Sequence, residues 1–439
     1  MKRLSIFVWG ALFYFSSYNT GLTESAAVHQ INRSLITCRD YLLAAGLENV
    51  QFQIARHQTI WLSYENRRYR NEITALGIVL TYATHCLPFA QHFVVVPHYR
   101  KMPLRYIEVD REVFQKFLQQ EISADDLVEH LQISYESPAE KPLTGYRSSM
   151  AQSSLFHIDL MLSPGVKAQF ARPDDPAQLQ FNCLADLSVT IAPGLQLFGQ
   201  WIGPLYNEFQ RPETNSRVGA LYLQQLVRLP ARTFVTMSAG RFEFDRQGLS
   251  AQVKTFFWRE RLSLAARGDY VSGQAINRLL PLELPSHNKL SYLFQVQYRF
   301  EPIHFMAQLT WGRYLLGDQG WRIDIVRLFH EIELGFMGVW NESLDFLTGM
   351  TVRLPLPMAK HPWPGAVRVR SPNYLSWNYR YLPCFDGLIL DTGEDFETIA
   401  RQFTRSFIRG NCQQFQTALR YVRLNTTDAH QKLLAERGK

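Results

Sequence analysis

The sequence lacks the marks of a helical membrane protein and of the common enzyme classes. Beyond the first fifteen residues, no stretch approaches the roughly 18–20 consecutive apolar residues that a spanning helix needs. The histidines form no HExxH pair, and neither a GxSxG elbow nor a GxGxxG or Walker loop occurs. No cysteine spacing matches a zinc site. We therefore expect no catalytic residues, no metal, no cofactor and no enzymatic activity.

A block of charge of one sign is also missing. The net charge is +7, but lysine and arginine are scattered among aspartate and glutamate. This scatter argues against a nucleic-acid partner, whereas an anionic polysaccharide or an acidic surface remains compatible with the balance. Aromatic residues are plentiful at 13%, and membrane barrels collect such residues in girdles at the two interfaces.

The first 27 residues have the pattern of a secretory signal. Lys2 and Arg3 form a basic head, Leu4–Phe15 is apolar, and Ala26 and Ala27 offer a cleavage site. The alternative is a membrane anchor, but the apolar run is shorter than the roughly 20 residues a spanning helix needs. We expect export and cleavage.

Export would bring five cysteines into an oxidising compartment. Two pairs drawn from Cys38, Cys86, Cys384 and Cys412, with Cys183 left over, are the simplest arrangement. Connectivity cannot be deduced from sequence, and five buried reduced thiols are the alternative.

Residues 291–354 contain five short segments in which apolar and polar residues alternate. In the first, Tyr292, Phe294, Val296, Tyr298 and Phe300 alternate with polar residues. Successive side chains of a strand point to opposite faces, so each segment has one apolar and one polar face. A soluble sandwich gives the same pattern.

Alternation begins at Leu155 and predicts about 12 strands, with a range of 10–14, and no helices between them. The secretory signal, tryptophans at segment ends such as Trp258 and Trp311, and the lack of covering helices favour a barrel over a soluble sandwich. The predicted fold class is mainly β: an antiparallel outer-membrane β-barrel preceded by a small α+β periplasmic domain.

The predicted organisation has five parts. They are a signal peptide (1–27), an α+β periplasmic domain (28–134), a linker (135–154), the barrel (155–382) and a helical C-terminal tail (383–439). Within the first domain we expect helices at Val28–Ala44, Ile73–His85, Arg111–Gln119 and Ala124–His130, the last with a capping box formed by Ser123 and Asp126. In the tail we expect helices at Asp395–Ile408 and Cys412–Arg423.

Charged residues on the polar faces of the strands are candidates for lining a lumen. They either border an open channel or pack as an ion-pair network. These residues are Asp159, Asp186, Arg267, Asp269, Arg322, Asp324, Glu331, Glu333 and Arg353. A separate acidic cluster, Asp391, Glu394, Asp395 and Glu397, is either a cation site or, as we favour, the start of a helix stabilised by its dipole.

The run from Thr310 to Phe329 resembles the YjbH-like family of outer-membrane proteins from exopolysaccharide and capsule operons. The matching residues are Gly312, Arg313, Tyr314, Leu315, Gly317, Asp318, Gly320, Arg327 and Phe329. The runs Ser163–Val166, Ala192–Leu195, Val352–Pro357 and Ser63–Asn71 are also similar to the family. By pattern, residues 312–320 are a hairpin turn in which Asp318 is able to hydrogen-bond its own backbone.

The resemblance implies a non-enzymatic outer-membrane barrel that takes part in exopolysaccharide or capsule production or export. The expected location is the cell outer membrane, with the N-terminal domain in the periplasm. Expected partners are outer-membrane lipid, polysaccharide and other export-system proteins. The alternatives are a general porin or adhesin-like barrel, and a secreted polysaccharide-acting enzyme on a β scaffold.

Overall fold

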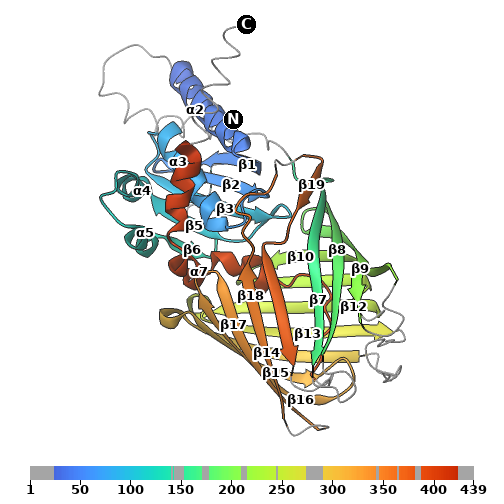
Figure 1. The fold of residues 1–439 in the computed structure, drawn as a ribbon. Coiled ribbons are helices and arrows are strands. Elements are labelled where there is room, and N and C mark those ends of the chain that lie inside the picture. Colours follow the sequence, from blue (N-terminus) through green and yellow to red (C-terminus); the bar gives the residue numbers. More distant parts are fainter. Residues whose placement is uncertain are drawn as a thin grey trace, which may run out of the picture.

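The computed structural model describes residues 24–139, 142, 153–170, 177–208, 215–243, 246–272, 290–342, 346–362, 365–380 and 387–423. Within them, a small α+β domain sits at one end of a large curved sheet, and the C-terminal segment returns to that domain (Figure 1). No described helix is both long and apolar enough to cross a membrane.

The N-terminal domain packs helices against a six-stranded sheet of order β1-β2-β3-β5-β6, with β4 beside β3. Its strands are β1 (Leu47–Ile54), β2 (Thr59–Asn66), β3 (His92–Tyr99), β4 (Met102–Pro103), β5 (Tyr106–Asp110) and β6 (Gln132–Ser134). Its helices are α2 (Glu24–Ala44), α3 (Glu72–Cys86), α4 (Arg111–Leu118) and α5 (Ala124–His130). Only β2 and β3 pair in parallel.

The helices form where the sequence predicts them. In α5, Ser123 and Asp126 make the predicted capping box. Helix α3 is apolar on all sides because it is buried from Ile73 to Thr84, between the sheet and the C-terminal helix. Helix α2 begins at Glu24, four residues earlier than expected, and residues 1–23 lie outside the described part, so the signal peptide stays a prediction.

The second sheet has fourteen strands, within the predicted range of 10–14. Its order is β19-β7-β8-β9-β10-β11-β12-β13-β14-β15-β16-β17-β18-β20. The strands are β7 (Ile158–Phe170), β8 (Ala177–Ala192), β9 (Leu195–Asn207), β10 (Arg217–Leu229), β11 (Thr233–Arg241), β12 (Gln247–Phe257), β13 (Leu262–Ser272), β14 (Leu290–Phe300), β15 (Phe305–Arg313), β16 (Gln319–Phe329), β17 (Ile332–Asn341), β18 (Leu347–Pro355), β19 (Val367–Arg370) and β20 (Tyr374–Arg380). Short η2 (Trp258–Glu260) and η3 (Glu301–Ile303) turns join neighbouring strands.

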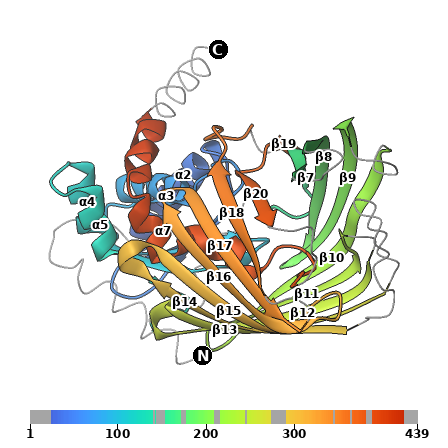
Figure 2. The same ribbon diagram turned by 60° about the horizontal axis from the view of Figure 1, so that its bottom comes forward.

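The large sheet curves strongly, but its edges do not pair with each other (Figure 2). From β7 to β18 and on to β20, every step is antiparallel. Twelve reversals leave β7 and β20 running in the same direction, so they cannot close the sheet with an antiparallel ladder. Strand β19 pairs with β7 in parallel over four residues only.

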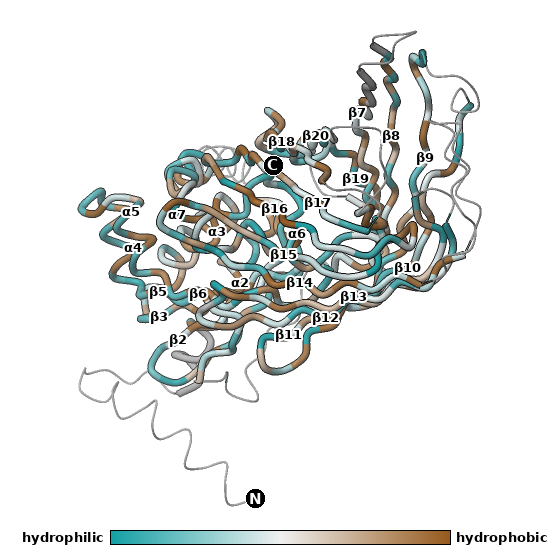
Figure 3. The backbone as a smooth tube through the Cα atoms, turned by 90° about the horizontal axis from the view of Figure 1, so that it is seen from below, coloured by the Kyte–Doolittle hydropathy of each residue, from teal (hydrophilic) through white to brown (hydrophobic). Residues whose placement is uncertain are grey.

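The two faces of the sheet differ as the alternation predicts. Along β14, Phe294, Val296 and Tyr298 are exposed, whereas Gln297 and Arg299 are buried. Hydrophilic and hydrophobic residues alternate in this way along β12 and β13 (Figure 3). The polar face is therefore the covered one, which is the reverse of a soluble sandwich.

The predicted linker is anchored at both described ends. Tyr135 is buried among Arg105, Phe234 and Phe396. At the other end, the hydroxyl of Ser154 donates to the carboxylate of Glu65 at 2.9 Å. The polar segment therefore begins and ends inside packed structure.

The C-terminal tail is helical but broken. It contains α6 (Phe396–Ala400), η4 (Arg401–Phe403), α7 (Arg405–Gly410) and a helix over residues 414–423. The predicted continuous helix Asp395–Ile408 is wrong because Thr404 is in an extended conformation and its hydroxyl caps α7 by accepting from the amide of Phe407.

Four cysteines lie in the described part as thiols. Cys38 on α2 hydrogen-bonds Cys86 at the end of α3; this bond lowers the pKa of Cys86, and burial raises that of Cys38. Cys412 contacts Asp125, and Cys384 lies outside the described residues. The two thiols lie within hydrogen-bonding distance, so the Cys38–Cys86 pair is placed for oxidation to a disulfide.

We expect Cys38 and Cys86 to form a disulfide when the chain matures in an oxidising compartment. A loop of this length stabilises the domain by roughly 2–4 kcal/mol. Non-reducing peptide mapping by mass spectrometry will find the linked peptides, and a reductant will lower the melting temperature. In the Cys86→Ser variant the reductant should have no such effect; unlinked thiols in exported protein would contradict the prediction.

Candidate functional site: the filled interior of the curved sheet

The covered polar face of the large sheet faces a segment of the same chain. Residues 387–403 run inside the curve of the sheet, from the turn between β15 and β16 to the end at which the N-terminal domain sits (Figure 2). We refer to Gly387–Ala400 as the inner segment. Its contacts with the sheet are the candidate functional site.

The inner segment begins at the turn that carries the family-like motif. The carboxylate of Asp318 accepts hydrogen bonds from the amide of Gly387 at 2.8 Å and from the side chain of Asn341 at 3.0 Å. The amide of Leu315 donates to the carbonyl of Leu388 at 3.1 Å. The turn therefore binds the C-terminal part of the chain, a role that the sequence did not indicate.

The glycines of this turn permit a close approach between strands. A Cβ atom on Gly312 would lie 2.0 Å from the carbonyl oxygen of Tyr292, and one on Gly320 would lie 2.0 Å from that of Trp340. Any side chain at either position would push β14 or β17 away. Arg313 ends β15, and Gly317 has a positive φ inside the turn.

In its middle, the inner segment is held by β12 and β13. Arg267 donates to the carbonyl of Leu390 at 2.5 Å and to the hydroxyl of Thr392 at 3.0 Å, and it also pairs with Asp269 at 2.9 Å. The hydroxyl of Thr392 lies 3.1 Å from that of Ser250. These bonds satisfy polar groups that would otherwise be buried without partners.

At its far end, the inner segment places the acidic Glu397 beside two basic residues on the polar face of the large sheet, which we call the wall. Glu397 accepts from Lys254 at 2.9 Å and also pairs with Arg299. Asp395 caps α6 by accepting from the amide of Thr398 at 2.8 Å. The favoured interpretation of the acidic cluster, a helix start, therefore holds for Asp395.

Gly393 brings the backbone of the inner segment close to β10. Its φ is +109°, and a Cβ there would lie 2.5 Å from the side chain of Gln224 and 2.9 Å from the ring of Tyr222. Only glycine fits this position.

The N-terminal domain also binds the inner segment. Arg100, which is buried, donates to Glu394 at 2.9 Å and to Gln224 of β10 at 3.0 Å, and Tyr99 also contacts Glu394. One arginine thus joins the domain, the inner segment and the sheet wall.

A second cluster fastens the domain to the sheet edge. Arg368 of β19 makes hydrogen bonds of 2.7 Å to both oxygens of Glu48 and of 2.8 Å to Asp159 of β7. Arg67 lies 3.7 Å from Asp159 and 2.6 Å from Glu65. All five side chains are nearly inaccessible to solvent, so each charge depends on its partners.

The predicted lumen residues lie in this network or at its borders. Asp186 accepts from Gln200, Arg322 pairs with Asp324 at 2.7 Å, and Glu331 binds Arg70 and Asn71. Glu333 pairs with Arg401 of the C-terminal tail, and the guanidinium of Arg353 lies 3.9 Å from the carboxylate of Glu333. These side chains are paired with one another, with the tail or with the N-terminal domain, and within the described residues no three potential metal ligands gather.

Sequence reasoning missed the partner of this network. Lys254 and Glu397 are 143 positions apart, and no local pattern links them. The sequence carries one signal of this contact: an acidic run, Asp391 to Glu397, follows the last strand, and basic residues such as Lys254 and Arg299 lie on the strands.

Comparison with known proteins adds a family. The family model YjbH, described as exopolysaccharide biosynthesis protein YbjH, matches residues 20–340. The match spans well over half of the chain. The chain belongs to the YjbH family. This membership confirms the family resemblance seen in residues 310–329, and it implies a role in exopolysaccharide biosynthesis. No curated protein matches the chain. The inner segment of this YjbH-family member lies beyond the matched residues.

We expect the stability of the N-terminal domain to depend on pH through Glu65, a fully buried residue. Burial raises its pKa, but Arg67, Ser154 and the amides of Lys101 and Arg100 outweigh burial and hold the pKa below its usual value. A depressed folded-state pKa stabilises the fold above the unfolded-state pKa, and this contribution is lost as pH falls through the folded value.

The Glu65→Gln variant tests this at neutral and acidic pH. At pH 7 it should be less stable than the native chain, and the difference should shrink as pH falls below about 4.5, the ordinary glutamate value. Urea unfolding followed by tryptophan fluorescence measures it. A difference that stays constant from pH 7 to pH 3 would rule out Glu65 as the source.

Proposed function

We propose that this YjbH-family protein is a non-enzymatic outer-membrane β-barrel that takes part in the production or export of exopolysaccharide or capsule. Its N-terminal domain lies in the periplasm, and its apolar face contacts outer-membrane lipid. The observation that carries the proposal is the inverted sheet, which covers its polar face and exposes its apolar one.

The exposed face is apolar over most of its length. Neighbouring strands present Leu223, Met237, Leu249, Val296 and Phe336, each more than 40% exposed. Monomeric soluble proteins rarely expose apolar patches larger than a few hundred Å². Tryptophans are exposed on the same sheet at Trp201, Trp311, Trp321 and Trp340, and at Trp258 in the η2 turn, as in the aromatic girdles of membrane barrels.

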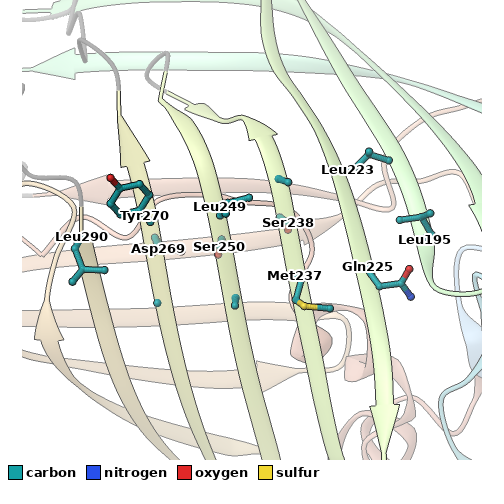
Figure 4. A pocket seen from close by; sticks show the side chains of 13 residues that line it. Leu195, Leu223, Gln225, Met237, Ser238, Leu249, Ser250, Asp269, Tyr270 and Leu290 are labelled. Carbon is teal, nitrogen blue, oxygen red and sulfur yellow. The ribbon is translucent and has the colours of Figure 1, made fainter.

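The strand lengths suit a bilayer. Strands β9 to β18 contain 9–13 residues each, and a tilted spanning strand needs about 9–11. The apolar face also holds a hollow of about 480 Å³ around Ala251 and Gly268, bordered by Met237, Leu249 and Tyr270 (Figure 4). Lipid acyl chains fit such an apolar hollow.

Because the inner segment occupies the inside of the curved sheet, the structure favours a barrel with a closed lumen over an open diffusion porin. The charged side chains of the wall are engaged by one another and by the inner segment, so they hold structure in place. This engagement also supports a non-enzymatic role over a polysaccharide-acting enzyme, because Glu397, Asp269, Asp324 and Glu333 each bind a basic side chain of the same chain.

A pair of neighbouring substitutions on β14 tests the membrane location. Val296→Arg places a charge on the apolar face at mid-strand, which costs a membrane barrel about 2–4 kcal/mol. Gln295→Arg places the same charge on the polar face. We expect the first to reduce folded protein in the outer-membrane fraction, read as heat-modifiable mobility on gels, and the second to spare it. Equal behaviour of the two variants, with native protein in the soluble fraction, would refute the proposal.

A gene deletion tests the biological role. Loss of the protein should lower the exopolysaccharide that the cells release or retain, and the native gene should restore it. The Val296→Arg variant serves as a control, since a chain that fails to insert should not complement. An unchanged polysaccharide yield in the deletion strain would contradict the role.

A further inference from the structure

The large sheet has more strands than a barrel whose interior is filled by its own side chains. Eight-stranded barrels are just filled by their side chains, whereas sixteen or more strands leave an aqueous channel. With fourteen strands, the sheet is closer in size to the barrels that enclose an aqueous channel. The inner segment therefore occupies space that would otherwise be a water-filled lumen.

The inner segment and the helices after it are held in different ways. Before α6, the wall holds the segment mainly through hydrogen bonds with Arg267, Ser250 and Gln224, with Leu388 and Leu390 as its buried apolar contacts. Water can replace such polar bonds at little net cost, since a typical one contributes only about 1 kcal/mol.

The helices that follow are anchored by apolar packing. Phe403, Phe407 and Phe415 are buried in the same core as the N-terminal domain. The helix over residues 414–423 packs so closely on α3 that a Cβ on Gly77 would lie 2.7 Å from that of Ala418. The tail therefore belongs to the core of the N-terminal domain.

The charges of the inner segment and the wall are complementary. Glu397 pairs with both Lys254 and Arg299 of the sheet, and Glu394 pairs with Arg100 of the N-terminal domain. Withdrawal of the segment would expose Lys254 and Arg299, together with the donors of Arg267 that now bind Leu390 and Thr392. The vacated wall would attract a polymer that carries carboxylates and hydroxyls.

We propose that the inner segment is a removable plug that imitates an acidic polysaccharide and competes with it for the cations of the lumen. This inference rests on the proposed function, because it requires a membrane barrel. The plug keeps the lumen closed, and an acidic polysaccharide opens it by displacing Glu397 from Lys254 and Arg299.

A reversible lock tests the closure. The hydroxyl oxygens of Ser250 and Thr392 lie 3.1 Å apart, so the double variant Ser250→Cys, Thr392→Cys places two sulfurs where a disulfide can form. In planar bilayers the oxidised full-length variant should stay closed, and reductant should restore the openings of the native protein. Equal conductance before and after reduction, with disulfide formation verified by mass spectrometry, would overturn the plug.

A release variant tests the charge complementarity. Glu397→Gln keeps the shape of the side chain but removes the charge that binds Lys254 and Arg299, so openings should become roughly tenfold more frequent. Glu136→Gln is the matched control, because Glu136 pairs at 2.8 Å with Arg232 on the surface. An equal effect of both variants would refute the assignment.

The open Glu397→Gln pore then tests the class of polymer. Polygalacturonate should reduce its current at a concentration at least tenfold lower than dextran of equal length, because only the former is anionic. Equal blockade would refute an acidic ligand. Flotation with liposomes separates this failure from that of the proposed function: a chain that does not float is no membrane barrel, whereas one that floats and lacks these responses has no such plug.

Discussion

The structure depends on one constraint: the polar face of a strongly curved sheet must have its buried groups paired. The face is too long for its own ion pairs to do this alone, although Arg322 and Asp324 or Arg267 and Asp269 begin the task. The inner segment supplies the remaining carboxylates, hydroxyls and carbonyls. Glu397 is therefore matched to Lys254, which precedes it by 143 positions, and to Arg299.

The same constraint explains the place of the N-terminal domain. Arg100 and the Glu48–Arg368–Asp159 cluster join the domain to the sheet through buried charges, which lose stability sharply if one partner leaves. The tail helices add apolar packing to that domain. The domain, the tail and the wall are thus one connected structure, and the part of the inner segment before α6 is held mostly by bonds that water can replace.

Local patterns in the sequence carried much of this fold. Period-two alternation predicted the strands and both faces, because burial of one face requires it, and Ser123 with Asp126 predicted the start of α5. The turn at residues 312–320 was found as a hairpin, since glycine marks a close approach of strands. Three features were not predicted, because each depends on where distant residues meet. They are the break in the tail helix at Thr404, the hydrogen bond between Asp318 and Gly387, and the pairing of Lys254 with Glu397.

The topology also bears on how the proposed barrel would close. With thirteen strands in the meander, β7 and β20 run in the same direction, so closure requires a parallel ladder between them. Strand β19 already offers β7 a parallel partner over Ile158–Met161, at the end where the domain is fastened. Beyond Met161 the edge of β7 carries backbone groups that would be costly to leave unpaired in lipid. The buried cluster at Arg368 holds β19 in place at this seam, so the charges that fasten the domain also determine where a closing ladder would begin.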